Sequence, residues 1–486
     1  MRKAFSSQLR LDCQSIEELQ LNLNCRDEIV PVLEGLKHVF GQPELRNHLT
    51  QLVANDLNET TRDDIGRAGF DYWQVVVLGT VRLGCNLDYD KLQDLCENHR
   101  ALRCLLCVGD WNDTSFAAKR IRDTLALLKV STLEEMNHAV VSYGQQFHGS
   151  ARSKVRADSF VIETNIHHPT ESSLIGDGMR KIIPLCGKLA PLFGEPGWRQ
   201  AKHLKKRVKQ LVREVARISA SKSPRVKATL NQAYANLLEL VGTLMQRARV
   251  LETKAQTAAA DLQTIALSSE LSHWLKLTAQ VCDTAYRRTQ LAEDVSNKDK
   301  LFSLFETHTQ LYRRGKAGQP NQFGRMALIY EDKAGFISHY HLMDREATDQ
   351  SVVVEQTRIA QHRHQDEIEE ASFDRAFHSD DNERELSEII NHPCLPPRHR
   401  NQYAERMNTA SVRFHRSRQH HPGVESAIGA LQSGNGLKRC RDKTENGLER
   451  YLGLAILGRN MQTLGKLVIA RVSQQAAACK TKRKAA

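Results

Sequence analysis

Three acidic residues stand in three separate segments, each at the edge of an element that should lie in the core. Asp158 lies in VRADSFVIE, Asp374 in ASFDRAF and Glu425 in HPGVESAIGAL. Phosphodiester cleavage needs an activated nucleophile and a stabilised leaving oxygen, and two divalent metal ions about 3.5–4 Å apart supply both. Because Mg²⁺ prefers carboxylate oxygens, acids from distant segments could converge on one such site.

Asp158 is the best supported of the three on physical grounds. The alternation and β-branched content of 153–166 predict a strand. A carboxylate in a central strand is costly unless it is paired or metal-bound, whereas in an edge strand it would simply face water. Glu163 competes for the same role, but its odd spacing from Asp158 puts it on the opposite face.

The other two acids have common alternatives. Asp374 follows a short expected strand, where an ordinary turn aspartate would also be found, and Asp349 is its main rival. Glu425 opens a helix, where an acid often only complements the helix dipole. No periodicity links the three acids, so the residues alone leave the triad open.

The elements expected around these acids alternate between strands and helices. A hairpin with its turn at Asp332-Lys333-Ala334-Gly335 is predicted within Gly324–Leu342. An a/d seam of apolar residues over 204–251, broken at Pro224, predicts a helical hairpin within a helical stretch 199–314. Helices are expected at Tyr72–Gly84, Tyr89–Cys107, Leu262–Tyr286, Ser351–Arg363 and Asp380–Ile390, and from Thr170, Val424 and Leu448.

The composition is that of a basic protein, and its cysteines are expected to be free thiols. The 486 residues carry a net charge of +12, which favours a polyanionic partner, although ribosome-associated and membrane-surface proteins share this bias. The eleven cysteines form no framework, and Cys104 and Cys107 are better explained by core packing than by zinc. No stretch is long and apolar enough to span a bilayer, so we expect a cytoplasmic protein without a membrane segment.

The strongest charge run lies in the helical stretch. Arg199–Lys227 holds eleven Lys and Arg residues and one acid, Glu214. Such a helix could track phosphates, although a solvated charged face is the alternative. The residues expected to contact DNA are Lys202, Lys205, Lys206, Arg207, Lys209, Arg213, His421, Lys438 and Arg439.

Five segments resemble blocks of bacterial insertion-sequence transposases of the DDE type, in particular the ISNCY-like group. In chain order they are GRAGFDYWQVVVLGTVRLGCNLDYDKLQDLCENHRALR, DSFVIETNIHHPTESSLIGDGMR, FGRMALIYEDKAGFISHYHLM, SFDRAFHSDDN and HPGVESAIGALQSGNGLKRCRDK, the last with Leu457-Gly458-Arg459-Asn460. They cover most of the chain. Four positions depart from the group's usual pattern, namely Glu171, Ala376 (where a glycine is usual), His421 and Gln432.

The resemblance implies a function and a set of ligands. Asp158, Asp374 and Glu425 would bind Mg²⁺ or Mn²⁺ as catalytic residues. The substrate would be double-stranded DNA, both the ends of an insertion sequence and a target, and the protein would act as a homo-oligomer in the DNA complex. In the family, water first frees a 3′-hydroxyl, which then attacks the target.

The expected fold class is an α/β RNase H-like catalytic core interrupted by an all-helical insertion, with an N-terminal helical domain. The expected boundaries are a DNA-binding domain at 1–130, the catalytic domain at 150–198 and 318–475, the insertion at 199–317 and a basic tail at 476–486, in which we expect Lys480–Lys484 to be disordered. The alternative function is a catalytically inactive DNA-binding relative. A helical scaffold that assembles through the 204–251 seam is a third reading, but it leaves the acidic segments unexplained.

Overall fold

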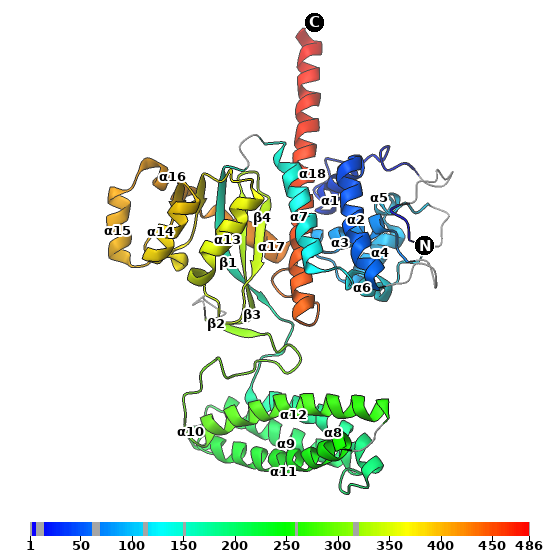
Figure 1. The fold of residues 1–486 in the computed structure, drawn as a ribbon, viewed down its shortest axis with the longest axis vertical. Helices are drawn as coiled ribbons and strands as arrows, with labels where there is room; N and C mark the ends of the chain where they lie inside the picture. The colour runs from blue at the N-terminus through cyan, green and yellow to red at the C-terminus, as the bar shows by residue number, and fades with distance from the viewer. Residues whose placement is uncertain are drawn as a thin grey trace. The chain divides into compact units, whose positions relative to one another are not determined.

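The computed structural model describes residues 2–5, 14–60, 69–109, 115–148, 152–257, 261–313 and 320–485. The protein is a mixed α/β chain with a mixed sheet. It forms two compact units, Met1–Asn165 together with Arg325–Ala486, and Ile166–Gly324 (Figure 1). The three acids of interest all lie in the first unit.

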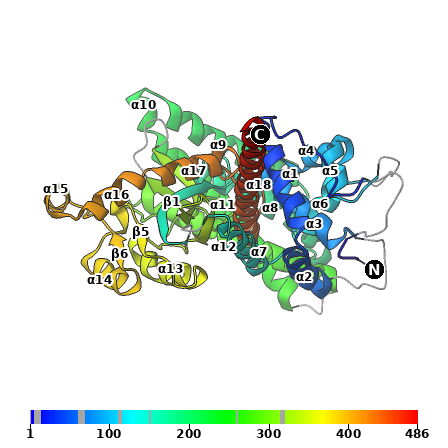
Figure 2. The same cartoon turned by 90° about the horizontal axis from the view of Figure 1, so that it is seen from above.

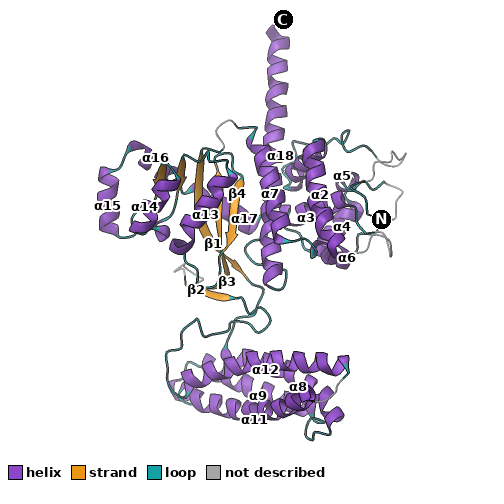
Figure 3. Ribbon diagram, viewed as in Figure 1, coloured by secondary structure: helices purple, strands orange, loops and turns teal. Residues whose placement is uncertain are grey.

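Six strands form one sheet, drawn in orange in Figure 3. The strand order is β2-β3-β1-β5-β6, and β4 also pairs with β3. β4 runs antiparallel to β3, whereas β1, β5 and β6 are parallel. The strands are β1 (Lys154–Glu163), β2 (Gln310–Arg313), β3 (Asn321–Asp332), β4 (Ile337–Leu342), β5 (Glu370–Ser372) and β6 (His392–Cys394).

The two faces of the sheet belong to different apolar cores. Val155 and Ala157 of β1 pack with Phe373 and with α13 (Asp349–Arg363) and α14 (Asp380–Ile389). Phe160 and Ile162, at even positions of the same strand, pack in the main core with the helix α17 (Gly423–Ser433). Strand alternation therefore directs Asp158, which is also at an even position, to the α17 side.

The N-terminal helices pack around the long C-terminal helix α18 (Glu445–Ala485), as Figure 2 shows for α1 and α3. Buried Asn460 of α18 ties this arrangement to the sheet, because its amide bonds both backbone groups of Ile337 and the side chain of Asn137. Arg82 also bonds Asp442 through two N–H groups at 2.6 and 2.8 Å. The helices are α1 (Ile29–Phe40), α2 (Pro43–Thr60), α3 (Tyr72–Gly84), α4 (Tyr89–Asn98), α5 (Arg100–Leu105), α6 (Ala118–Leu125) and α7 (Val130–Gln145).

The second unit is built mainly of helices around one apolar core. Val208, Val215 and Leu237 belong to it, and they lie on the a/d seam that the sequence predicts. The structure places α8 in this unit, ahead of the expected start of the insertion at 199. The helices are α8 (Glu171–Leu189), α9 (Ala201–Ala220), the short α10 (Pro224–Lys227), α11 (Leu230–Thr257) and α12 (Leu262–Thr289).

Several expected elements differ in the structure. The helix expected over Tyr89–Cys107 breaks at His99, whose ring accepts a hydrogen bond from Leu102 and caps a new helix. Helix does not extend to 314, because α12 ends at Thr289. Where a disordered tail was expected, α18 continues to Ala485. β2, β6 and the helices α15 (Arg400–Thr409) and α16 (Val412–His420) were not predicted. In the described part of the chain, no helix combines the length and apolarity required to cross a bilayer.

The pH dependence of stability offers a test of the packing beside β4. His364 is 1% exposed, and burial lowers its pKa from 6.5 to about 4. As the pH falls below 6.5, His364 becomes protonated in the unfolded chain but stays neutral in the folded chain. The free energy of unfolding therefore decreases. Glutamine does not titrate, so a His364→Gln variant does not undergo this loss. We expect the difference in free energy of unfolding between the parent and this less stable variant to shrink by about 2 kcal/mol from pH 7.5 to pH 5.0. Urea unfolding of both proteins at the two pH values measures this, and a constant difference would contradict it.

Candidate active site

The paired strands β1 and β5 bring two of the three acids onto one face of the sheet. Their parallel register aligns Lys154 with Glu370 and Arg156 with Ser372. If this register continued for two more residues, Asp374 would lie alongside Asp158. Phe373, which follows β5, donates its N–H to Cys394 of β6 on the other side. The sequence expectation of a mid-strand acid and an acid just beyond a strand end therefore holds for Asp158 and Asp374.

Both aspartates are partly exposed, so solvent and ligands can reach them. Oδ1 of Asp158 accepts a hydrogen bond of 2.7 Å from the Ser159 N–H. Asp374 precedes a short 3₁₀ helix, Arg375–Phe377, and its side chain makes no capping bond to that helix. Ala376 lies inside this turn and does not have a positive φ. Alanine is therefore compatible with the backbone at the position where the group usually has glycine.

Glu425 is carried by the helix that packs beside β1. It lies exposed in the first turn of α17, whose Val424 and Ala427 are buried in the main core with Phe160. Among the residues that the structure describes, no three His, Cys, Asp or Glu side chains gather into a group that could hold a metal ion. The structure thus places Asp158 in β1, Asp374 just beyond the paired strand β5 and Glu425 on a neighbouring helix, without gathering all three.

A set of polar contacts fixes the turn between α16 and α17 to the strands that carry the acids. Arg156 bonds Glu331 of β3 through Nε at 2.6 Å and donates from Nη1 to the His420 carbonyl at 3.0 Å. A Cβ added at Gly423 would lie 1.9 Å from Nη1 of Arg156. The backbone at residue 423 can therefore lie against the Arg156 guanidinium only because this residue is glycine.

The same turn is also fixed to β5. Nδ1 of His421 lies 3.2 Å from the Ser372 hydroxyl, and Arg418 donates to the Phe373 carbonyl at 3.1 Å. His421 is only 6% exposed, and burial, together with the Arg418 charge, lowers its pKa to about 4 while Asp374 opposes the shift. The ring is therefore neutral near pH 7 and holds the turn. We call residues 418–423 with Arg156 the turn anchor.

The glycine of the turn anchor gives a direct functional prediction. Gly423→Ala should displace the Arg156 guanidinium and shift the first turn of α17. If Glu425 takes part in strand cleavage, the cleavage rate should fall by about 10- to 100-fold, since a misplacement of about 1 Å can cost that much. Stability should change little, because the displaced atoms are the end of a flexible side chain. Cleavage rates and urea unfolding measure the two effects. Gly429→Ala in the same helix meets nothing within 4 Å and is the control; equal rates for the two variants would contradict the prediction.

The residues expected to contact DNA fall in both units. Lys438 and Arg439 are exposed, and Arg439 pairs with Glu163 at 3.2 Å, which gives this rival acid a structural partner. Six of these expected contacts lie on α9, are exposed, and have no ion pair or side-chain hydrogen bond within the described ranges. They are Lys202, Lys205, Lys206, Arg207, Lys209 and Arg213.

One buried acid that the sequence placed only in a turn is Asp332. Its Oδ1 accepts from the backbone N–H groups of Ala334 and Phe336, and its Oδ2 accepts from Gln145 at 2.8 Å. Burial outweighs these bonds and raises its pKa to about 7. Gly335 completes the turn with φ at 87°. These contacts assign Asp332 to the β3–β4 turn. Arg156 was not predicted as a site residue either, although its position two residues before Asp158 puts both on one face of the strand.

Comparisons of the chain with protein-family models, with curated proteins and with solved structures gave no match.

Proposed function

We propose that the protein is a DDE transposase that cleaves and transfers DNA strands at the ends of its own insertion sequence. The observation that carries this proposal is the parallel pairing of β1, which contains Asp158, with β5, which ends two residues before Asp374. The strand order changes direction at β1, which has β3 on one side and β5 on the other. Ligand sites in open α/β sheets commonly lie at such a switch point, beyond the carboxyl ends of the strands.

The topology supports an RNase H-like core for the first unit. β1 has an antiparallel hairpin, β3 and β4, on one side and two parallel strands, β5 and β6, on the other. Such a core needs one acid within the central strand and one at the end of the parallel neighbour. Asp158 and Asp374 occupy these positions.

The donor set fits Mg²⁺ or Mn²⁺. Two partly exposed carboxylates on one face suit a hard cation that takes oxygen ligands and retains waters. Asp158 and Asp374 would hold the metal, and the exposed Glu425 side chain would complete the set when DNA is bound. When bound, the metal supplies nucleophile activation and stabilises charge on the leaving oxygen.

The chain's own residues would position this chemistry. The turn anchor holds the start of α17, which carries Glu425, beside β1. Arg156 and Arg418 bring positive charge close to the two aspartates. The exposed cations of α9 would bind the phosphates of duplex DNA, with an affinity that falls as salt rises.

A strand-cleavage assay tests the proposal. Labelled duplexes that together cover the DNA flanking the coding sequence are incubated with the protein and Mg²⁺, and with EDTA in a parallel set. We expect nicking at one defined position near an end, only with the metal. Duplex binding without cleavage under any metal condition would instead support the inactive DNA-binding relative.

A further inference from the structure

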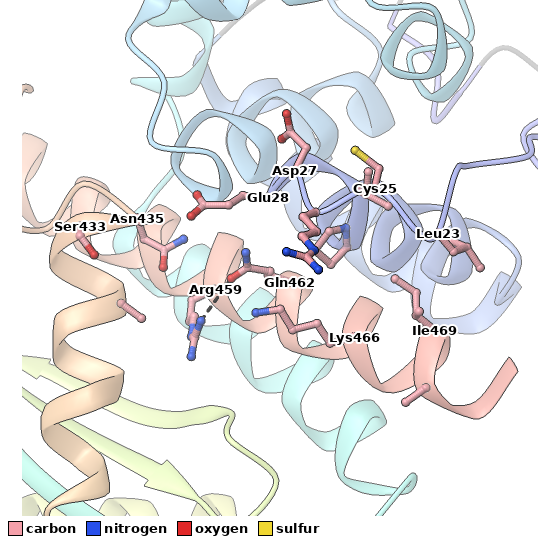
Figure 4. Close-up of a pocket in the computed structure, with 16 residues that line it drawn as sticks. Leu23, Cys25, Asp27, Glu28, Ser433, Asn435, Arg459, Gln462, Lys466 and Ile469 are labelled. Atoms are coloured by element: carbon pink, nitrogen blue, oxygen red, sulfur yellow. Dashed lines mark hydrogen bonds between the residues drawn. The ribbon is translucent and has the colours of Figure 1, made fainter. Parts of the chain in front are cut away.

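A cavity of about 640 Å³ lies within the first unit, away from the three acids (Figure 4). Its walls are the start of α1, the end of α17 and the middle of α18. Val30, Pro31 and Ile469 give it apolar surface, while Gln462 contributes a polar side chain. This size is within the usual range for small-ligand sites, which are mostly apolar with a few convergent polar groups.

Two cations of α18 line this cavity from the same side of the helix. Arg459 and Lys466 are seven residues apart, two helical turns, so they lie on one face. Neither forms an ion pair with any carboxylate that the structure describes. Nη1 of Arg459 donates to Gln462 at 3.2 Å, and Nε of Arg459 is buried without a hydrogen-bond partner.

The electrostatics of the pair favour an anion between them. Burial lowers the pKa of Arg459, and burial together with the Arg459 charge lowers the pKa of Lys466. Glu331 and then Glu28 oppose the shift of Arg459, and Glu28 opposes that of Lys466, but neither acid forms an ion pair with these cations in the described part of the chain. A bound anion would relieve the repulsion between the two side chains.

The chemistry of the donors selects a phosphate group. A guanidinium offers planar paired donors that match phosphate oxygens, and an ammonium adds a compact charge. The acids on the opposite wall, Asp27 and Glu28, limit the negative charge that a ligand can carry. Asp27 already accepts a bond from the Ile29 N–H and points away from Arg459 in Figure 4. Glu28 remains to accept bonds from hydroxyl or amine groups of the ligand.

We propose that this cavity binds the phosphate group of a nucleotide unit, held by Arg459 and Lys466. The unit is either a free mononucleotide or a nucleotide of a DNA strand, and the two share the same phosphate and hydroxyl chemistry. The site stands on its own geometry and does not depend on catalysis by the acids.

Titration of the full chain with AMP, and separately with a duplex, tests this site. Lys466→Gln changes an exposed residue, and Arg459→Lys retains a charge but loses the paired donors. The control is Lys443→Gln, an exposed lysine outside the cavity. Calorimetry measures AMP binding, fluorescence anisotropy measures duplex binding, and urea unfolding checks that each variant folds.

We expect each cavity variant to weaken binding by about 10-fold, the effect of losing one charge-assisted hydrogen bond, with no change in the control. An effect on AMP identifies a free nucleotide as the ligand. An effect on the duplex alone, larger than that of Lys443→Gln, identifies a DNA strand. The proposal would be overturned if both folded variants bound AMP and the duplex as tightly as the parent. It would also be overturned if the parent showed saturable binding of neither probe.

Discussion

Replacing Asp374 with Asn should reduce strand cleavage by about 1,000-fold or more while leaving binding of the DNA end intact. Asn keeps the size of the side chain but removes the charge that a divalent metal requires, and metal stabilisation of the transition state is worth several kcal/mol. Asp374 is partly exposed and makes no capping bond to the following turn, so the fold should tolerate the change. Cleavage of labelled ends and anisotropy of the same duplex measure the two effects.

The control for this substitution lies a few residues further along the chain. Asp380 is exposed in the first turn of α14, where an acid contributes only a weak interaction with the helix dipole. Asp380→Asn should therefore cleave at the parental rate. Cleavage retained by Asp374→Asn would remove this residue from the metal site, and Asp349 would then be the next candidate.

The largest effect on folding is expected at Gly465, where α18 touches α1 backbone to backbone. A Cβ at this position would lie 1.8 Å from the Pro31 carbonyl oxygen and 2.9 Å from the Gly35 nitrogen. Gly465→Ala must therefore push the two helices apart. We expect it to lower the free energy of unfolding by about 3 kcal/mol or more, the upper range for overpacking, because backbone atoms cannot rotate away.

Intrinsic helix propensity alone predicts that Gly465→Ala would raise the free energy of unfolding, since alanine is favoured over glycine by about 1 kcal/mol within a helix. Gly429→Ala isolates that term, because an added Cβ there meets nothing within 4 Å. It should leave stability unchanged or raise it slightly. Urea unfolding of the two variants beside the parent separates the effects, and a Gly465→Ala protein as stable as the parent would refute the close contact.

Much of the strand and helix content could be predicted from local pattern. Alternation placed β1, and the turn Asp332–Gly335 placed the β3–β4 hairpin where the structure has it. The a/d seam placed α9 and α11. These segments are long or strongly periodic, so their own residues carry the signal.

Features that depend on contacts between distant segments could not be predicted. Nothing local shows that Asn460 bonds Ile337, or that Gly465 touches Pro31, because each pair joins parts of the chain far apart in sequence. The strand β6 has only three residues, too few for a periodic pattern.

The strand positions of the two aspartates were predictable, but the groups that surround them were not. Asp158 lies within β1, and Asp374 follows β5, which pairs with β1 in parallel. Glu425 rested on resemblance, since an acid in a first helical turn carries no distinctive signal. The turn anchor was not foreseen, because the partners of Arg156 come from β3 and from the α16–α17 turn.

The proposed function requires Asp158 and Asp374 to hold catalytic metal ions. Anomalous diffraction from crystals of the protein with its DNA end and Mn²⁺ tests this directly. We expect two peaks about 3.5–4 Å apart, with carboxylate oxygens of both aspartates and of Glu425 as ligands. Peaks elsewhere, or none beside these aspartates in a complex that contains the DNA end, would contradict it.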